Sequence, residues 1–453
     1  MLGDVTGEFT ADWGPPQKLG HCRRPIDRVR MQAVVARLVA ATRTEGHGVF
    51  RQFRVQNFMC LKDVRIELEP LTIFVGPNSS GKSALFKALT CFSRLFWYPV
   101  RGGPRGEFSL EGGTTLDDVV WNGDSSFPII FEAWFRDNGA NDPDYTLELR
   151  RDYTGWRVTR EKFTYRGTRL DTAGGFTFAT AGGPKNFAAP FDAPLAYLLY
   201  RFTRDPVAAE DIEPVQQLRA RLGEARRYRP SASDVAAFVR PPSPGPPGRR
   251  ARETAVDEAG KGVALALRDL LASDRQTFAQ IETDLQKYHS HIRGITFRSD
   301  WRGVGLFYRT TRAAQELPAN LESDGVLLTT FLLWRLYTAP PNLKLCLEEP
   351  ENGVHLWALK ERYQLLKQYV TNQSERNVQV LIATHSRDFL NSIASRNEII
   401  EQVRVVECDG GSGTAVHPLT HYRQINELLD QCRDQMGDLW WSTRLEGRLT
   451  PSG

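Results

Sequence analysis

The stretch Leu71-Thr-Ile-Phe-Val-Gly-Pro-Asn-Ser-Ser-Gly-Lys-Ser83 decides the fold of this chain. Its last eight residues, 76–83, fit the phosphate-binding pattern G-x-x-x-x-G-K-[ST] at every fixed position. The apolar, β-branched residues before the loop predict a buried strand, and Leu85, Leu89 and Phe92 after it recur at helical spacing. A strand, a glycine-containing loop and a helix N-terminus in this order direct backbone N–H groups at a phosphate. The sequence therefore predicts a nucleotide site.

Each residue type in this loop suits the binding of a nucleotide phosphate. Lys82 is expected to reach the β- and γ-phosphates, and the Ser83 hydroxyl is expected to ligate Mg²⁺. The residues expected to line the nucleotide are Gly76, Pro77, Asn78, Ser79, Ser80, Gly81, Lys82, Ser83 and Ala84.

A second motif, Leu343-Lys-Leu-Cys-Leu-Glu-Glu-Pro-Glu351, runs from an apolar strand into acidic residues. Such a strand beside a phosphate loop supplies what a Mg²⁺ site needs. Glu348 is expected to hold the metal through its water shell, and Glu349 to orient and deprotonate the attacking water. The alternative is a solvated helix start. The position of the run after a phosphate loop favours the metal site.

A third motif is the apolar run 378–383 followed by Thr384-His-Ser386, which predicts another buried strand with a polar end. Open α/β sheets bind ligands at the C-terminal ends of their parallel strands. His385 is therefore expected to contact the γ-phosphate and to sense its loss. A single His at a strand end is more often structural, so this assignment depends on the order of all three motifs.

In this order the motifs resemble the ABC-type ATPase heads of the RecF/SMC-like group, and within it the ATPase half of the overcoming-lysogenisation-defect (OLD) proteins. The matching segments are Asn57-Phe58, Leu61-Lys-Asp63, GPNSSGKS, Leu321-Glu-Ser-Asp-Gly325, LEEPENGVHL and ATHS, scattered over residues 50–408. The resemblance implies an α/β P-loop NTPase fold of the ABC-ATPase type, with a mixed sheet, an antiparallel β lobe and an inserted helical subdomain. It implies ATP and Mg²⁺ as ligands and a homodimer as the working form.

The resemblance also identifies Ser323-Asp-Gly325 as the signature motif, in which Ser323 and Gly325 cap the γ-phosphate of ATP bound to the other protomer. The apolar run that follows predicts a helix, so its N–H donors would face an anion. Alone, Ser-Asp-Gly is an ordinary turn and helix cap. Its place upstream of the acidic strand favours the signature.

The chain departs from this group at one metal ligand. ABC-type ATPases place a Gln after the phosphate-loop helix, whereas this chain has no Gln between Gln56 and Gln216. Either another group, such as Asp117 or Asp118, contacts the metal through water, or that ligand is missing.

Composition divides the chain into segments with different expected structures. They are a poorly ordered extension (1–48), the first part of the ATPase head (49–126), an inserted β lobe (127–204), an inserted helical subdomain (205–292), the second part of the head with signature, acidic strand and His (293–408), and a tail (409–453). A net charge of +4 is too small to imply nucleic-acid binding by itself. Six scattered Cys without a C-x-x-C pair, no membrane-length apolar run and no signal peptide indicate a cytoplasmic protein.

Two functions remain open. The first is an ATP-driven dimeric switch that acts on double-stranded DNA in repair or phage defence, with the Arg-rich segment around Arg226, Arg227 and Arg229 as a phosphate contact or, alternatively, as a salt-bridged face. The second is a regulatory ATP sensor that controls a nuclease or toxin effector without binding DNA. OLD proteins usually carry a Toprim nuclease domain, for which the 68 residues after His385 are too few, so no nuclease activity is expected here.

Overall fold

The structure is a computed structural model. It describes residues 49–97, 114–136, 141–153, 155–165, 168–171, 176–180, 183–187, 218, 220–241, 256–353, 356–372, 376–393, 395–408, 411, 413–422, 425–433 and 435–446. The extension expected at 1–48 lies outside these residues, as do Arg219, Arg249, Arg250 and Arg252 of the Arg-rich segment.

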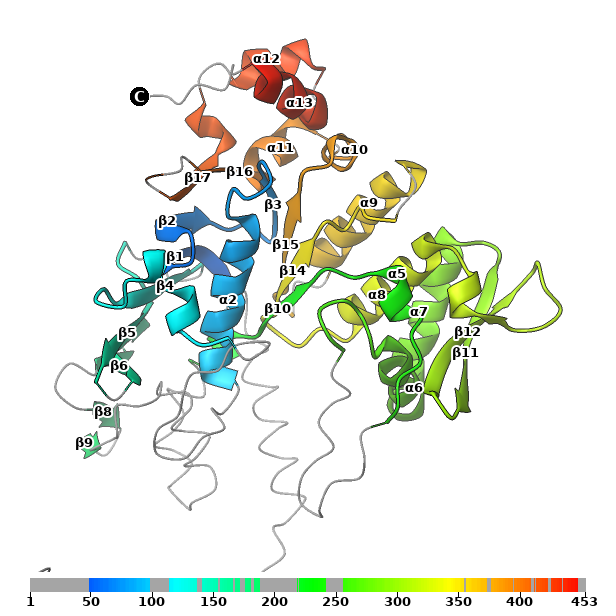
Figure 1. Ribbon diagram of the computed structural model, residues 1–453, viewed down its shortest axis with the longest axis horizontal. Helices are drawn as coiled ribbons and strands as arrows, with labels where there is room; N and C mark the ends of the chain where they lie inside the picture. The colour runs from blue at the N-terminus through cyan, green and yellow to red at the C-terminus, as the bar shows by residue number, and fades with distance from the viewer. Residues whose placement is uncertain are drawn as a thin grey trace, which may run out of the picture. The chain divides into compact units, whose positions relative to one another are not determined.

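A six-stranded sheet with the order β10-β14-β15-β3-β16-β17 carries the three sequence motifs (Figure 1). Its strands are β3 (Leu71–Val75), β10 (Ala225–Tyr228), β14 (Lys344–Glu348), β15 (Gln379–Thr384), β16 (Val403–Cys408) and β17 (Thr414–Pro418). All neighbours pair in parallel except β16 and β17, so the sheet is mixed, as the sequence predicts. The strands β3, β14 and β15 are buried along their whole length, which is why they read as continuous apolar runs.

Successive side chains of β3 enter different hydrophobic cores because side chains alternate along a strand. Leu71, Ile73 and Val75 pack in one core with helices α8 (Asp324–Tyr337) and α9 (Leu356–Asn372), whereas Phe74 packs in the other with α2 (Lys82–Trp97). The other helices that contribute side chains to the first of these cores are α5 (Ala232–Val235), α6 (Val263–Ser273), α7 (Arg275–Tyr288), α10 (Arg387–Leu390), α11 (Arg396–Gln402), α12 (Ile425–Gln431) and α13 (Met436–Glu446).

A second six-stranded sheet, with the order β2-β1-β4-β5-β6-β7, is antiparallel throughout. Its strands are β1 (Phe50–Phe58), β2 (Leu61–Glu67), β4 (Ile129–Phe135), β5 (Tyr145–Asp152), β6 (Gly155–Tyr165) and β7 (Thr168–Asp171). Strands β4, β5 and β6 lie in the segment 127–204, for which the sequence predicts a β lobe. Residues 50–67 precede the phosphate loop, and their place in the first part of the ATPase head (49–126) predicts that they join the sheet that carries this loop. They pair in the antiparallel sheet instead, because β4 offers β1 a partner along its length.

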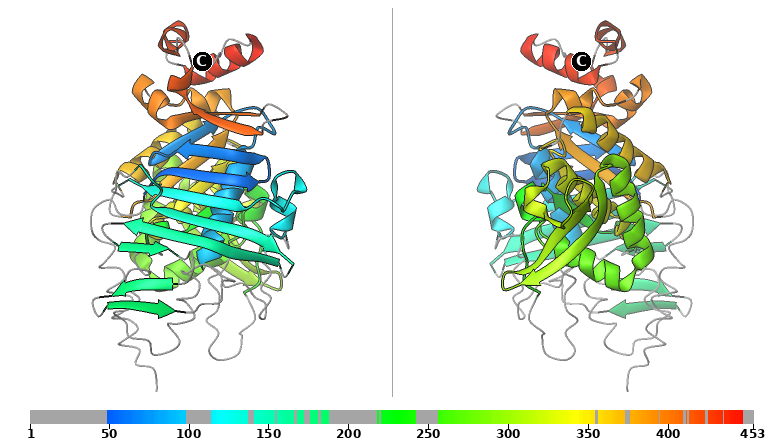
Figure 2. Two further views of the ribbon diagram at one scale, coloured as in Figure 1. Left: turned by 90° about the vertical axis from the view of Figure 1, so that its left-hand side faces the viewer. Right: turned by 90° about the vertical axis from the view of Figure 1, so that its right-hand side faces the viewer.

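Helix α2 lies between the two sheets, and the left view of Figure 2 shows it behind the antiparallel strands. The ring centroid of Phe92 on α2 is 5.5 Å from those of Phe53 and Phe131. Cys346 and Leu381 of the mixed sheet belong to the same core. The helix that follows the phosphate loop is therefore held on both sides by apolar contacts.

Two smaller sheets complete the described elements. One contains β11 (Ile292–Asp300), β12 (Gly303–Thr310) and β13 (Leu317–Pro318), and the other β8 (Phe176–Thr180) and β9 (Gly183–Phe187). Within the region expected to be mostly helical, residues 225–228 form the strand β10 instead. Pairing with β14 supplies their backbone hydrogen bonds and buries Ala225 and Tyr228.

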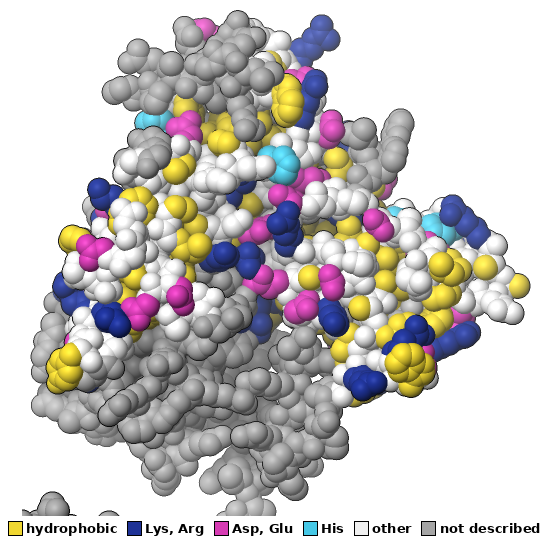
Figure 3. Space-filling view, viewed as in Figure 1, with side chains coloured by type: hydrophobic (Ala, Val, Ile, Leu, Met, Phe, Trp, Pro, Cys, Tyr) yellow, Lys and Arg dark blue, Asp and Glu magenta, His cyan; other side chains and the backbone are white. Residues whose placement is uncertain are grey.

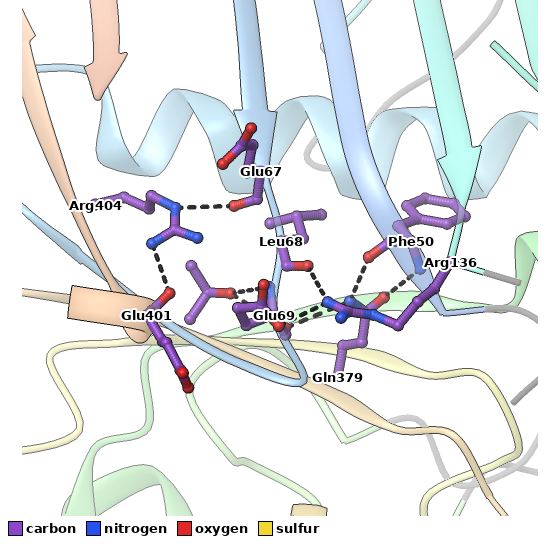
Figure 4. Close-up of polar contacts among 9 residues, drawn as sticks. Phe50, Glu67, Leu68, Glu69, Arg136, Gln379, Glu401 and Arg404 are labelled. Atoms are coloured by element: carbon purple, nitrogen blue, oxygen red, sulfur yellow. Dashed lines mark hydrogen bonds and ion pairs between the residues drawn. The ribbon is translucent and has the colours of Figure 1, made fainter. Parts of the chain in front are cut away.

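A buried glutamine joins the two large sheets (Figure 4). The side-chain amide of Gln379 on β15 accepts a hydrogen bond from the backbone N–H of Phe50 and donates one to the carbonyl of Phe50, both at 2.8 Å. Close by, Arg136 donates to the carbonyl of Leu68, and Arg404 donates to the carbonyl of Glu67. These bonds fix the connection that leads from β2 into β3.

We expect Gln379→Ala to lower the free energy of unfolding by about 2–5 kcal/mol, because it leaves the buried N–H and C=O of Phe50 without partners. Urea unfolding followed by circular dichroism measures the change. Gln368→Ala, on the exposed face of α9, is the matched control and should cost little. A loss no larger than that of the control would show that the bridge does not hold the sheets together.

Candidate nucleotide site

The loop between β3 and α2 has the backbone that a phosphate-binding loop requires. Ser79 and Gly81 have positive φ angles of 65° and 106°. A Cβ added at Gly81 would lie 2.2 Å from Oγ1 of Thr414, and one added at Gly76 would lie 2.3 Å from the carbonyl oxygen of Val406. The two glycines therefore let the loop pack closely against β16 and β17.

The charged and hydroxyl side chains of the loop are placed at the start of α2. The Lys82 ammonium donates to the carbonyls of Gly76 and Pro77 at 2.8 and 2.7 Å, so the loop curls around it. Ser83 is exposed at the first turn of the helix. Ser80 Oγ is buried and has no hydrogen-bond partner among the described residues. A phosphate bound to the loop N–H groups would offer acceptors to these side chains.

The register of the parallel strands brings the other two motifs to the same edge of the sheet. Glu348 at the end of β14 pairs with Ala383 of β15, which pairs with Phe74 of β3. Beyond these paired residues the chain continues as Glu349 after β14, as Thr384 and His385 at the end of β15, and as the phosphate loop after β3. The sequence motifs at 76–83, 348–349 and 385 thus end neighbouring strands.

Glu348 is almost fully buried, with 5% of its surface exposed. Its Oε1 lies 3.3 Å from Nη1 of Arg227, which also pairs with Glu258. A buried carboxylate needs such a counter-charge, and a metal ion would provide another.

Glu349 is held by three different groups. Its Oε2 accepts hydrogen bonds from Nη2 of Arg229 at 2.5 Å and from Nδ2 of Asn352 at 2.8 Å, and its Oε1 lies 3.7 Å from Nδ1 of His385. Burial acts to raise the pKa of Glu349, but the hydrogen bonds from Asn352 and Arg229 outweigh it and keep the pKa below its ordinary value. Glu349 is therefore ionised near neutral pH and able to accept a proton.

The sequence motifs assign no role to the neighbouring Glu351. Burial raises the pKa of its carboxyl, and its Oε1 accepts a 2.5 Å hydrogen bond from Thr384 Oγ1. This bond ties the acidic loop after β14 to the end of β15, just before His385. No local pattern indicates it, because Thr384 and Glu351 meet only when the two strands pair.

The signature residues lie at the start of α8. Ser323 is the N-cap residue, its side chain is exposed, and its hydroxyl makes no capping hydrogen bond. The acidic loop approaches the same helix: Arg362 donates to the carbonyl of Pro350 at 2.5 Å and to Thr329 Oγ1 at 3.4 Å. A Cβ added at Gly353 of this loop would lie 3.2 Å from Cβ of Asp324, so the signature segment lies near the acidic loop of its own protomer.

The two aspartates considered as replacements for the missing Gln have local partners. Asp117 pairs with Arg151 at 2.8 Å and accepts from the indole of Trp156, and Asp118 accepts from the backbone and hydroxyl of Thr115. Asp117 is therefore held by residues of β5 and β6, and Asp118 is held by Thr115.

Mg²⁺ prefers oxygen ligands and usually keeps several waters, with one or two protein groups and the phosphates as its other ligands. The Ser83 hydroxyl and the Glu348 carboxylate fit this small set. In the described ranges, no group of three or more His, Cys, Asp and Glu is arranged to hold a metal ion by itself. The site therefore fits a metal that arrives with a nucleotide.

Comparison with known families and proteins gives matches that cover different shares of the chain. Residues 71–391, more than half of it, match the family model described as "AAA domain, putative AbiEii toxin, Type IV TA system". A 53-residue segment is 36% identical to an "OLD nuclease" of Thermus scotoductus, and it spans 12% of this chain and 10% of that protein.

Solved structures of SMC head domains are similar at low identity. The SMC head domain from Thermotoga maritima matches with a TM-score of 0.36 and 12% identity, covering 82% of this chain and 98% of that one. An Smc head domain with an extended coiled coil, bound to the C-terminal domain of ScpA from Pyrococcus furiosus, matches with a TM-score of 0.40 and 11% identity, covering 85% and 99%.

Proposed function

The chain belongs to the AAA-domain family that matches residues 71–391, and from this premise we propose that it binds and hydrolyses ATP as a homodimer. Its relationship to ABC-type P-loop ATPases and to OLD proteins, predicted from the motifs, is confirmed. So is the α/β fold with a mixed sheet and an antiparallel β lobe. We propose ATP hydrolysis, the formation of a homodimer, and the macromolecule on which that dimer acts.

One observation carries the proposal. The parallel register of β3, β14 and β15 brings together the groups that follow these strands: the phosphate loop after β3, Glu348 and Glu349 at the end of β14, and His385 after β15. A phosphate-binding loop alone would fit any nucleotide-binding protein. An ionised carboxylate beside it, within 4 Å of a histidine, adds a proton acceptor for hydrolysis.

Each residue then has a distinct role. Lys82 and the loop N–H groups hold the phosphates, while Ser83 and Glu348 hold Mg²⁺, which would neutralise developing charge on the phosphates. Glu349 accepts the proton of the attacking water. His385, whose side chain is 44% exposed, contacts the γ-phosphate and reports its loss.

In the proposed dimer Ser323 and Gly325 complete the nucleotide site of the partner. The exposed start of α8 supports this role, because the Ser323 side chain is exposed and makes no capping hydrogen bond to its own helix. ATP would then hold two protomers together, and hydrolysis would let them separate.

Two kinds of macromolecule are candidates for what the proposed ATPase acts on, which we call its load. Double-stranded DNA is the first, and a nuclease or toxin effector protein is the second. One observation favours the second: the described arginines of the Arg-rich segment are engaged within the chain, Arg226 with Glu224, Arg227 with Glu348 and Glu258, and Arg229 with Glu349. Among the described residues on the face drawn in Figure 3, basic and acidic side chains are intermixed, without a large patch of one sign. Within the described part of the chain, no helix is long and apolar enough to cross a membrane.

Steady-state ATP hydrolysis, measured with and without double-stranded DNA, separates the two loads. If DNA is the load, the rate rises on adding DNA and the rise disappears at high salt, because phosphate contacts are lost as counterions compete. Glu349→Gln serves as the blank for contaminating ATPases. A rate that DNA leaves unchanged would remove DNA from the proposal and leave the effector protein as the load.

A further inference from the structure

The carboxylate of Glu349 is fixed through one of its two oxygens. Oε2 accepts from Arg229 at 2.5 Å and from Asn352 at 2.8 Å. A carboxylate oxygen has two lone pairs in its plane, so these donors fill the acceptor capacity of Oε2. Oε1 is left facing His385, 3.7 Å from its Nδ1.

The backbone of each donor is itself held by a hydrogen bond. Arg229 directly follows β10, and its backbone N–H donates to the carbonyl of Glu258 at 2.8 Å. Asn352 belongs to the acidic loop, and its backbone N–H donates to the carbonyl of Glu349 at 3.0 Å. Glu349 itself has a φ of +48° and donates its N–H to Ala383 at 2.8 Å. Both the backbone and the side chain of Glu349 are therefore constrained.

Oε1 of Glu349 and Nδ1 of His385 lie near each other without a direct hydrogen bond. A separation of 3.7 Å is too long for a direct hydrogen bond, but one water can contact both atoms at normal distances. During hydrolysis this water would give a proton to Oε1 while its oxygen forms the new bond to the γ-phosphorus. The bond to the β–γ bridging oxygen breaks, and ADP leaves with the electron pair.

We propose that Arg229 and Asn352 are positioning residues, which hold Oε2 of Glu349 so that Oε1 faces the attacking water next to His385. This inference rests on the proposed ATP hydrolysis. The Arg229 side chain is 61% exposed, and exposed ion pairs contribute little to stability. Its contact with Glu349 therefore has more effect on the orientation of the carboxylate than on folding.

The test compares Arg229→Ala, Arg229→Lys and Asn352→Ala in steady-state ATP hydrolysis. We expect kcat to fall about tenfold to hundredfold in Arg229→Ala, as small misplacements of a reacting group cost this much, with KM for ATP changed by less than about twofold. Arg229→Lys should restore part of the loss because it keeps one charged donor. The double Ala variant should lose less than the product of the single losses, since both residues hold the same oxygen.

The control is Arg268→Ala, which removes an exposed ion pair with Asp269 on α6 and should leave kcat unchanged. Thermal unfolding of every variant checks that the fold is kept. A normal or raised kcat in Arg229→Ala, while Glu349→Gln is inactive, overturns the positioning role and leaves the proposed function standing. Normal turnover by Glu349→Gln would instead contradict the proposed function.

Discussion

Lys82→Ala should weaken ATP binding by at least about a hundredfold. The Lys82 ammonium lies inside the loop, bonded to the carbonyls of Gly76 and Pro77, at the place where the phosphates of a nucleotide would arrive. Each hydrogen bond from a charged group to a phosphate is worth about 1.5–3 kcal/mol, and the substitution removes the bonds expected to both the β- and the γ-phosphate together with the positive charge. Isothermal titration with a slowly hydrolysed ATP analogue measures the affinity.

Lys87→Ala is the matched control for this prediction. Lys87 lies on the same helix, α2, and is exposed, so its loss changes the net charge equally without touching the loop. The control should bind ATP with unchanged affinity. Tight binding by Lys82→Ala would show that the nucleotide lies elsewhere in the molecule.

The parts of the site that sequence could predict are those determined by local pattern. Residues 71–83 contain the strand, the loop and the helix start together, and the positive φ of Gly81 agrees with the glycine that the motif requires there. Glu348 and His385 could also be placed, because each ends an apolar run and the ends of parallel strands share an edge.

The parts that sequence could not predict depend on contacts between distant segments. Arg229 is 120 residues from Glu349, and its role appears only when β10 pairs with β14. In the sequence, residues 225–228 read as part of a helical, Arg-rich region, since four residues carry too little periodicity to identify a strand. Likewise, β1 and β2 read as part of the nucleotide-binding sheet because β4, which joins β1 to the antiparallel sheet, lies more than 60 residues further on.

A physical connection between the two halves of the proposed switch is visible within one protomer. The acidic loop that carries Glu349 reaches α8 through Arg362, which is buried and bonded to both Pro350 and Thr329. In the proposed switch, a change at Glu349 on loss of the γ-phosphate would reach α8, whose N-cap is Ser323, through this contact. The dimer contact and the hydrolysis site would then respond together.

Glu349→Gln tests both ends of this connection in one variant. The amide can still accept hydrogen bonds from Arg229 and Asn352 through its oxygen, but it cannot take a proton from water. We expect ATP affinity to be kept and the steady-state rate to fall by about a hundredfold to ten-thousandfold, the usual contribution of a general base. Because ATP then persists, light scattering should show a particle of twice the monomer mass that forms only with ATP and Mg²⁺.

Two further variants isolate the cause of that dimer. Adding Ser323→Arg to Glu349→Gln places a bulky cation at the exposed start of α8 and should abolish the dimer while the monomer still binds ATP, since the residue is proposed to contact only the partner's nucleotide. Glu427→Gln, an exposed carboxylate on α12, should behave as wild type in every assay. If Glu349→Gln stays monomeric with ATP bound, the proposed ATP-dependent dimer is wrong. If the variant hydrolyses ATP at the normal rate, the proton acceptor is another group.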